Sequence, residues 1–288
     1  MRVLISGCGY VGSALGILLT TQGHTTFGLR RNTTALPLTI LPVQADLSTS
    51  LPPDALPTNL DAVVYAASPA GSTDEAYRAA YVDGPRSLLS ALTPQGSLRR
   101  FVFVSSTGVY AQREGEWVDE ESPTEPQSYS GKRLLEGECG VLGSTFSATV
   151  LRLGGIYGPG RTGAIDRALR QASEEKDPSR YTNRIHRDDC VGALRHLLLL
   201  RDPAPLYLGV DHEPTTRQEI HEWLTAQGYT PPPTLETFSR NTTCGTSRSR
   251  TNKRCSNARL VSSGYRFRYP TFREGFAALL DGANNYSR

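Results

Sequence analysis

A glycine-rich segment directly after the first apolar run constrains the fold of this chain more than any other feature. The apolar run at 3–6 predicts a buried strand, and a helix is expected to begin near Val11. Between them lies a GxGxxG pattern formed by Gly7, Gly9 and Gly12. A second strand is expected at 25–29. This order of strand, glycine loop, helix and strand is typical of a fold that binds a dinucleotide, although a glycine-rich turn alone is common.

Each glycine has its own expected role in that loop. Gly7 permits the tight turn, Gly9 lets a diphosphate approach the backbone, and Gly12 lets the helix pack close to the strand. The backbone N–H groups at the start of the helix would point toward the diphosphate. The candidate cofactor contacts in the loop are Gly7, Gly9, Tyr10, Val11 and Gly12.

Composition excludes several other classes of protein. The net charge of +3 is too small to predict a nucleic-acid or membrane partner. The five cysteines are scattered without a CxxC pair, which argues against disulfides and against a metal site. No apolar run reaches membrane-spanning length, and the glycines interrupt any signal-peptide pattern. We therefore expect a cytoplasmic protein with no metal.

Strand and helix patterns alternate through the first half of the chain. Short apolar runs predict buried parallel strands at 3–6, 25–29, 41–44, 62–66, 101–105 and 148–153. Helical patterns lie between them at 13–22, 74–92 and 131–142. This alternation predicts an α/β fold, a Rossmann-type doubly wound parallel sheet. We expect a dinucleotide-binding domain at 1–155 and a smaller, mixed substrate domain at 156–288, with 183–210 returning to the main sheet.

Arginine stands where NAD-binding folds of this kind carry an acid. About 20 residues after the glycines, at the end of the second strand, come Arg30 and Arg31. A guanidinium at this place would pair with the 2′-phosphate of NADP, so we expect NADP, with NAD as the alternative. The alternative is a solvated arginine pair at a strand end, which is common. Further candidate cofactor contacts follow the next two strands: Asp46, Leu47, Ala66 and Ala67.

Several later motifs form an ordered set with the glycine loop. They are Phe103–Tyr110 (FVSSTGVY), Tyr129–Arg133 (YSGKR), Ile156–Gly160 (IYGPG) and Asn183–His186 (NRIH). Together they resemble the extended short-chain dehydrogenase/reductase superfamily, in its NAD-dependent epimerase/dehydratase group. The resemblance covers nearly the whole chain and is greatest to an atypical branch typified by the YeeZ-like proteins.

The resemblance implies a set of catalytic residues. In the superfamily a Ser or Thr, a Tyr and a Lys act together while a hydride moves to or from the nicotinamide. By position Ser106 matches the Ser/Thr and Tyr129 matches the proton-transferring Tyr. The family lysine, four residues after the Tyr, is replaced here by Arg133, whereas Lys132 lies three residues after it. Because both positions share a helix face with Tyr129, either cation remains a candidate.

Other polar residues have less specific interpretations. Tyr110 is expected to pack in its loop, and His186 to be a structural, hydrogen-bonded histidine. The carboxylates of Asp188 and Asp189 are expected to cap a helix at 190–200. The basic stretch at 240–259 is interpreted first as a solvated loop, then as a contact for an anionic substrate, and last as a nucleic-acid contact.

The expected function is hydride transfer to or from a small hydroxyl or carbonyl metabolite or a nucleotide sugar. The alternative is a non-catalytic NADP-binding redox sensor or regulatory protein. The expected partner is a small molecule, which an anionic group would suit, with no nucleic acid and no membrane; a homodimer stays open.

Overall fold

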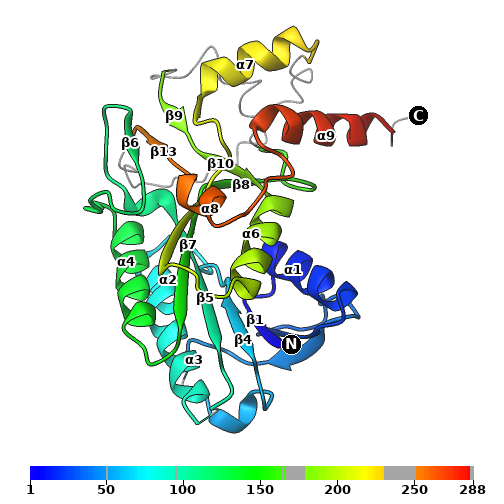
Figure 1. The fold of residues 1–288 in the computed structure, drawn as a ribbon, viewed down its shortest axis with the longest axis vertical. Coiled ribbons are helices and arrows are strands. Elements are labelled where there is room, and N and C mark those ends of the chain that lie inside the picture. The colour runs from blue at the N-terminus through cyan, green and yellow to red at the C-terminus, as the bar shows by residue number, and fades with distance from the viewer. Residues whose placement is uncertain (50, 95, 164, 166–178, 230–250, 286–288) are drawn as a thin grey trace.

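The computed structural model describes residues 1–49, 51–94, 96–163, 165, 179–229 and 251–285. Its centre is a seven-stranded, all-parallel sheet in the order β11-β7-β5-β4-β1-β2-β3 (Figure 1). The strands of this sheet are β1 (Arg2–Ser6), β2 (Thr25–Arg30), β3 (Leu41–Gln44), β4 (Ala62–Tyr65), β5 (Arg100–Ser106), β7 (Ala148–Leu153) and β11 (Leu206–Gly209). The predicted Rossmann-type sheet is therefore confirmed, with strand ends shifted by a residue or so.

Helices cover both faces of the sheet. Helix α1 (Tyr10–Thr21) packs beside α6 (Arg187–Leu199) on one face, and α3 (Gly84–Leu92) packs beside α4 (Tyr129–Leu142) on the other. The strands are buried on both sides as a result: Val3 of β1 belongs to one apolar core and the next residue, Leu4, to the other. Alternate side chains of one strand thus enter opposite layers, which explains the continuous apolar runs.

The helix expected at 74–92 is divided into three segments. It consists of α2 (Asp74–Arg78), a π-helical stretch η2 (Ala79–Asp83) and α3. Helix α4 begins two residues earlier than expected, because the Ser128 side chain accepts a hydrogen bond from the Gly131 N–H and caps it. Short 3₁₀ turns occur at η1 (Pro53–Ala55) and η3 (Thr107–Val109).

Three two-stranded sheets lie beyond the carboxyl edge of the main sheet. They pair β8 (Gly155–Tyr157) with β10 (Arg184–His186), β9 (Tyr181–Thr182) with β12 (Thr215–Thr216), and β6 (Glu116–Val118) with β13 (Lys253–Cys255). The helices of this region are α7 (Arg217–Ala226), α8 (Ala258–Ser262) and α9 (Phe272–Asn285). Residues 240–250 of the basic stretch lie outside the described residues. Within the described ranges, no helix has the length and apolar character needed to cross a membrane.

Candidate functional site

The glycine loop joins β1 to α1 at the carboxyl edge of the sheet, and its glycines have different surroundings. Gly7 has a φ of +80°, and a Cβ there would lie 2.3 Å from the Ala67 backbone. A Cβ on Gly12 would lie 2.9 Å from Ile5 Cγ2. A Cβ on Gly9 would meet only the Gly7 carbonyl oxygen, at 3.9 Å. Gly7 and Gly12 are therefore required by packing, whereas Gly9 borders open space from which a ligand can approach.

The two arginines at the end of β2, Arg30 and Arg31, have different neighbours. Burial raises the pKa of the Cys8 thiol in the glycine loop, and the nearby positive charge of Arg30 partly opposes this. Hydrogen bonds from Ser48 hold the pKa of Asp46 below its usual value, and the charge of Arg31 adds to the effect. Arg30 therefore lies near the glycine loop, and Arg31 lies near the carboxylate that follows β3.

The other candidate cofactor contacts are also at this edge. The Ala66 N–H donates to the Ser6 carbonyl oxygen at 2.7 Å, so β4 ends beside the start of the glycine loop. Val11 is half-buried against the core beneath α1, and Leu47 is half-buried against the opposite core. Both side chains therefore pack against the two cores that flank this edge of the sheet.

Ser106 and Tyr129 come from two elements that meet at the same edge of the sheet. Ser106 ends β5, and its hydroxyl oxygen accepts a hydrogen bond from the Gly108 N–H at 3.1 Å. Tyr129 begins α4, and its hydroxyl donates to the carbonyl oxygen of Ser72. The Tyr129 ring lies edge-on to Tyr77, with 5.5 Å between ring centroids. Both hydroxyl groups thus stand at the carboxyl edge, where ligands bind to open parallel sheets.

A glycine allows α4 to start beside the loop that follows Ser106. A Cβ on Gly131 would lie 2.4 Å from Pro126 Cβ and 3.2 Å from the Gly108 carbonyl oxygen. Any larger residue would push the first turn of α4 away from that loop. Gly131 therefore fixes the approach of the segment that carries Tyr129 to the segment that carries Ser106.

The two candidate cations of α4 have different environments. The Arg133 guanidinium holds both carboxylate oxygens of Asp74, at 2.8 and 2.9 Å, and contacts Glu136 at 2.8 Å. The hydrogen bond with Arg133 lowers the pKa of the Asp74 carboxyl. Lys132 is exposed and makes no ion pair within the described part of the chain. Arg133 is thus engaged in a helix–helix contact, and Lys132 is available for another role.

A buried ion pair lies next to the strand end that carries Ser106. Glu138 of α4 and Arg152 of β7 are 3% and 5% exposed, and their closest atoms, Oε2 and Nη2, are 2.6 Å apart. The Ser105 hydroxyl donates to Glu138 at 2.5 Å. Because Ser105 directly precedes Ser106, the pair fixes the end of β5 relative to α4.

The same network reaches the loop after β5 through Tyr110. Arg152 donates to the Tyr110 hydroxyl oxygen at 2.8 Å, and that hydroxyl donates to the Asp119 carbonyl oxygen at 2.6 Å. Burial raises the pKa of Tyr110 to about 12, although Arg152 opposes the shift. Tyr110 therefore packs in its loop, as expected, and is not placed to exchange protons near neutral pH.

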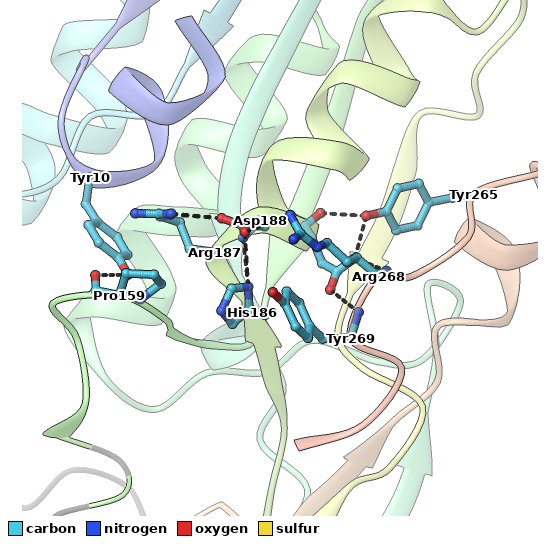
Figure 2. Close-up of polar contacts among 9 residues, drawn as sticks. Tyr10, Pro159, His186, Arg187, Asp188, Tyr265, Arg268 and Tyr269 are labelled. Atoms are coloured by element: carbon cyan, nitrogen blue, oxygen red, sulfur yellow. Dashed lines mark hydrogen bonds and ion pairs between the residues drawn. The ribbon is translucent and has the colours of Figure 1, made fainter. Parts of the chain in front are cut away.

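His186 has a structural role at the start of α6. Its Nδ1 accepts a hydrogen bond from the Asp188 N–H at 3.1 Å, so His186 caps this helix (Figure 2). Burial lowers the pKa of His186 to about 4, which keeps the imidazole neutral at physiological pH. The expectation that Asp188 and Asp189 cap a helix at 190–200 is wrong, because the helix already begins at Arg187.

Asp189 instead anchors the segment that leads to α9. Its carboxylate accepts hydrogen bonds from the Tyr265 hydroxyl at 2.8 Å and from the backbone N–H groups of Arg268 and Tyr269 at 2.7 and 2.9 Å. Its side chain is fully buried. The carboxylate therefore links α6, which packs on the main sheet, to the segment 265–269.

The supporting residues Asp74 and Glu138 were not expected from the sequence. A detectable signal existed for the second: Arg152 lies inside a strand expected to be buried, and a buried arginine requires an acidic partner. The sequence does not indicate which acid this is. For Asp74 there was no such signal, since acids in a first helical turn are common.

Comparisons with known proteins agree on the family. The family model described as "NAD dependent epimerase/dehydratase family" matches residues 3–203. A solved structure from Methylobacillus flagellatus, described as an NAD-dependent epimerase/dehydratase, is 35% identical over 98% of both chains, with a TM-score of 0.79. A search among curated protein sequences gave no significant match.

More distant structures share the fold. MoeE5 in complex with UDP-glucuronic acid and NAD is 21% identical, covering 99% of this chain and 100% of its own, with a TM-score of 0.81. The human epimerase family protein SDR39U1 with NADPH is 20% identical, covering 98% of this chain and 99% of its own, with a TM-score of 0.77. The match of the family model and the 35% identity over almost the full length show that the chain belongs to the NAD-dependent epimerase/dehydratase family.

Proposed function

We propose that this protein is an NADP-preferring oxidoreductase of the epimerase/dehydratase type. It would act on a small metabolite with a hydroxyl or carbonyl group, or on a nucleotide sugar. The observation that carries the proposal is the meeting of the glycine loop, Ser106 and Tyr129 at one edge of the sheet. This arrangement supports a single site in which a dinucleotide would lie beside two hydroxyl groups that could contact a substrate oxygen.

The loop residues fit a dinucleotide. Gly9 leaves the backbone open on the side where a diphosphate would lie, and no side chain caps the N-terminus of α1. Arg30, near the loop, and Arg31 would pair with the 2′-phosphate of NADP. When bound, the nicotinamide supplies or accepts the hydride. The known complexes of SDR39U1 with NADPH and of MoeE5 with NAD support either cofactor in this fold.

Three side chains of the protein would act on the substrate. The Ser106 oxygen already accepts one hydrogen bond, so its O–H can donate to a substrate oxygen. Tyr129 would exchange a proton with that oxygen through its hydroxyl, in place of its present bond to Ser72. Lys132 would supply the positive charge, because Arg133 is held by Asp74.

Cofactor preference gives the first test. Thermal shifts of the full-length protein should be larger with NADPH than with NADH at equal concentrations. Arg30→Asp should remove the NADPH advantage, because a carboxylate there repels a 2′-phosphate and suits a free ribose hydroxyl. Arg201→Asp, at a 96% exposed side chain, controls for the change in charge. Equal shifts with both cofactors in the unmodified protein would refute NADP preference.

A non-catalytic dinucleotide sensor is the second candidate, and one observation favours it. The position of the family lysine carries Arg133, which is occupied by an ion pair with Asp74. Reaction with a panel of carbonyl compounds and nucleotide sugars separates the two candidates. Catalysis is supported by oxidation of bound NADPH with a carbonyl compound, by reduction of bound NADP+ with a nucleotide sugar, or by conversion of the sugar without net redox change, provided that the reaction is lost in Tyr129→Phe but kept in Tyr77→Phe. Binding of the cofactor with none of these reactions across the panel supports the sensor.

A further inference from the structure

The ring of Tyr10 lies within reach of two guanidinium groups. The guanidinium carbons of Arg161 and Arg187 are 4.8 and 5.4 Å from the ring centroid. The Tyr10 hydroxyl donates to the carbonyl oxygen of Pro159 at 2.9 Å (Figure 2). Tyr10 directly follows Gly9, so both cations are held at the glycine loop by segments far away in the sequence.

The backbone brings these segments together closely. Gly158 and Arg161 close a turn, with the Arg161 N–H donating to the Gly158 carbonyl oxygen at 2.8 Å. A Cβ on Gly158 would lie 2.8 Å from the Tyr10 hydroxyl oxygen and 3.0 Å from Arg187 Cβ. Since α1 and α6 pack side by side, their first residues, Tyr10 and Arg187, are neighbours. Gly158 has a φ of +149°, so any side chain at this position would be strained and would also displace the Tyr10 hydroxyl.

This place holds more positive charge than its acidic neighbour can balance. Asp188 pairs with Arg187 at 2.9 Å and also with Arg268 at 3.4 Å. Arg161 is exposed and has no carboxylate partner among the residues that the structure describes. Arg187 moreover begins α6, where a cation is unfavourable beside the positive end of the helix dipole. An anion beside Tyr10 would be attracted by both guanidinium groups and by the positive end of the α6 dipole.

We propose that Arg161 and Arg187 bind the diphosphate of the dinucleotide, with the Tyr10 ring holding both side chains in position. This inference rests on the proposed function, since it requires a dinucleotide in the glycine loop. Guanidinium groups bind phosphate oxygens through paired, charge-assisted hydrogen bonds, and contact with an aromatic face orients them. The two pairs of arginines would then bind different parts of the cofactor. Arg30 and Arg31 would bind the 2′-phosphate, which only NADP carries. Arg161 and Arg187 would bind the diphosphate, which NAD and NADP share.

Because the two pairs of arginines would bind different phosphate groups, the experiment compares NADPH with NADH. Dissociation constants for NADPH and NADH are measured by titration calorimetry on the full-length protein and on Arg161→Gln, Arg187→Gln and Arg30→Gln. Arg161→Gln and Arg187→Gln should each weaken both cofactors by the same factor, about tenfold for a lost charged hydrogen bond. Arg30→Gln should weaken NADPH alone. Arg201→Gln, which removes an exposed charge that lies beside Asp202, should change neither constant.

The possible outcomes are distinct. Affinities of Arg161→Gln and Arg187→Gln equal to those of the unmodified protein overturn the inference, and so does a loss confined to NADPH. If the unmodified protein binds neither cofactor, the proposed function fails, and the inference fails with it. Melting temperatures are measured alongside. If Arg187→Gln does not fold, the exposed Arg161→Gln carries the test alone.

Discussion

Arg133 of α4 holds Asp74 of α2 in a two-pronged ion pair, with Nε–Oδ1 and Nη2–Oδ2 distances of 2.8 and 2.9 Å. Arg133 lies four residues after Tyr129, at the position where the family has its lysine. In this chain that position therefore serves helix packing. In the proposed function, the positive charge beside the ribose and the Tyr129 hydroxyl would therefore come from another residue. Lys132, exposed one residue earlier on the same helix, is the nearest source in the sequence.

Replacing Lys132 or Arg133 by glutamine should therefore have different effects. Lys132→Gln should weaken NADPH binding several-fold, because the amine would no longer reach the ribose hydroxyls, while leaving the melting temperature unchanged. Arg133→Gln should do the reverse, with a lower melting temperature and little change in affinity. Fluorescence titration of NADPH and thermal unfolding measure the two effects. A larger loss of affinity in Arg133→Gln than in Lys132→Gln would contradict our assignment.

The open space beside Gly9 leads to a second prediction. Gly9→Ala should fold, since its Cβ would meet only the Gly7 carbonyl oxygen at 3.9 Å, but it should bind NADPH at least tenfold more weakly because the methyl group occupies the path of the diphosphate. Gly7→Ala should instead lower stability strongly, through its φ of +80° and its contact with Ala67. Thermal unfolding and NADPH titration distinguish the two variants.

Gly140→Ala is the matched control for Gly9→Ala. It lies in α4, a Cβ there has no atom within 4 Å, and alanine favours a helix. This variant should bind NADPH normally and be as stable as the unmodified protein or slightly more stable. If Gly9→Ala bound the cofactor as well as Gly140→Ala does, the diphosphate would not pass over this loop.

The buried pair of Glu138 and Arg152 leads to a stability prediction. Glu138→Ala leaves the Arg152 guanidinium buried without its carboxylate, so the free energy of unfolding should fall by about 3–5 kcal/mol. Glu136→Ala removes an exposed carboxylate of the same helix and should have a much smaller effect. Urea denaturation measures both. Similar losses in the two variants would show that the buried pair contributes no more than a surface contact.

Local sequence signals were sufficient for the main sheet. Its strands are short apolar runs such as 62–65 and 101–104, and the glycine loop identifies the first crossover. The small sheets were not predictable in the same way. Strands β6 and β13 have three residues each and pair across more than a hundred positions, so tertiary packing decides their pairing. The early start of α6 was also missed, because a histidine cap is uncommon.

The pairing of Ser106 with Tyr129 came from the family resemblance, which implies their roles. The structure places the elements that carry them, the end of β5 and the start of α4, at the same edge of the sheet. The engagement of Arg133 was not foreseeable, because it depends on which helix packs beside α4. The approach of Arg161 and Arg187 to Tyr10 likewise depends on the packing of α6 against α1.

Asp211, which follows β11, gives a pH-dependent prediction. It is 1% exposed, and within the described residues its Oδ2 has no hydrogen-bond partner, while Oδ1 accepts from the Glu213 N–H at 3.2 Å. Burial raises the pKa of Asp211 from 3.8 to about 7; the charge of Arg184 opposes the shift, and Glu213 and Asp189 add to it. The folded protein therefore binds this proton more tightly than the unfolded chain does.

The contribution of Asp211 to stability should thus be lost as pH rises. Below about pH 4 the carboxyl is protonated in both states, and between pH 4 and 7 the unfolded chain ionises first, which lowers the free energy of unfolding by up to about 4 kcal/mol. Asp211→Asn keeps a neutral group of the same shape, so its advantage over the unmodified protein should grow from pH 5 to pH 8. Urea denaturation at both pH values measures this, with Asp202→Asn, at a 90% exposed carboxylate, as the control. A difference that stays constant with pH would show that Asp211 is not the titrating group.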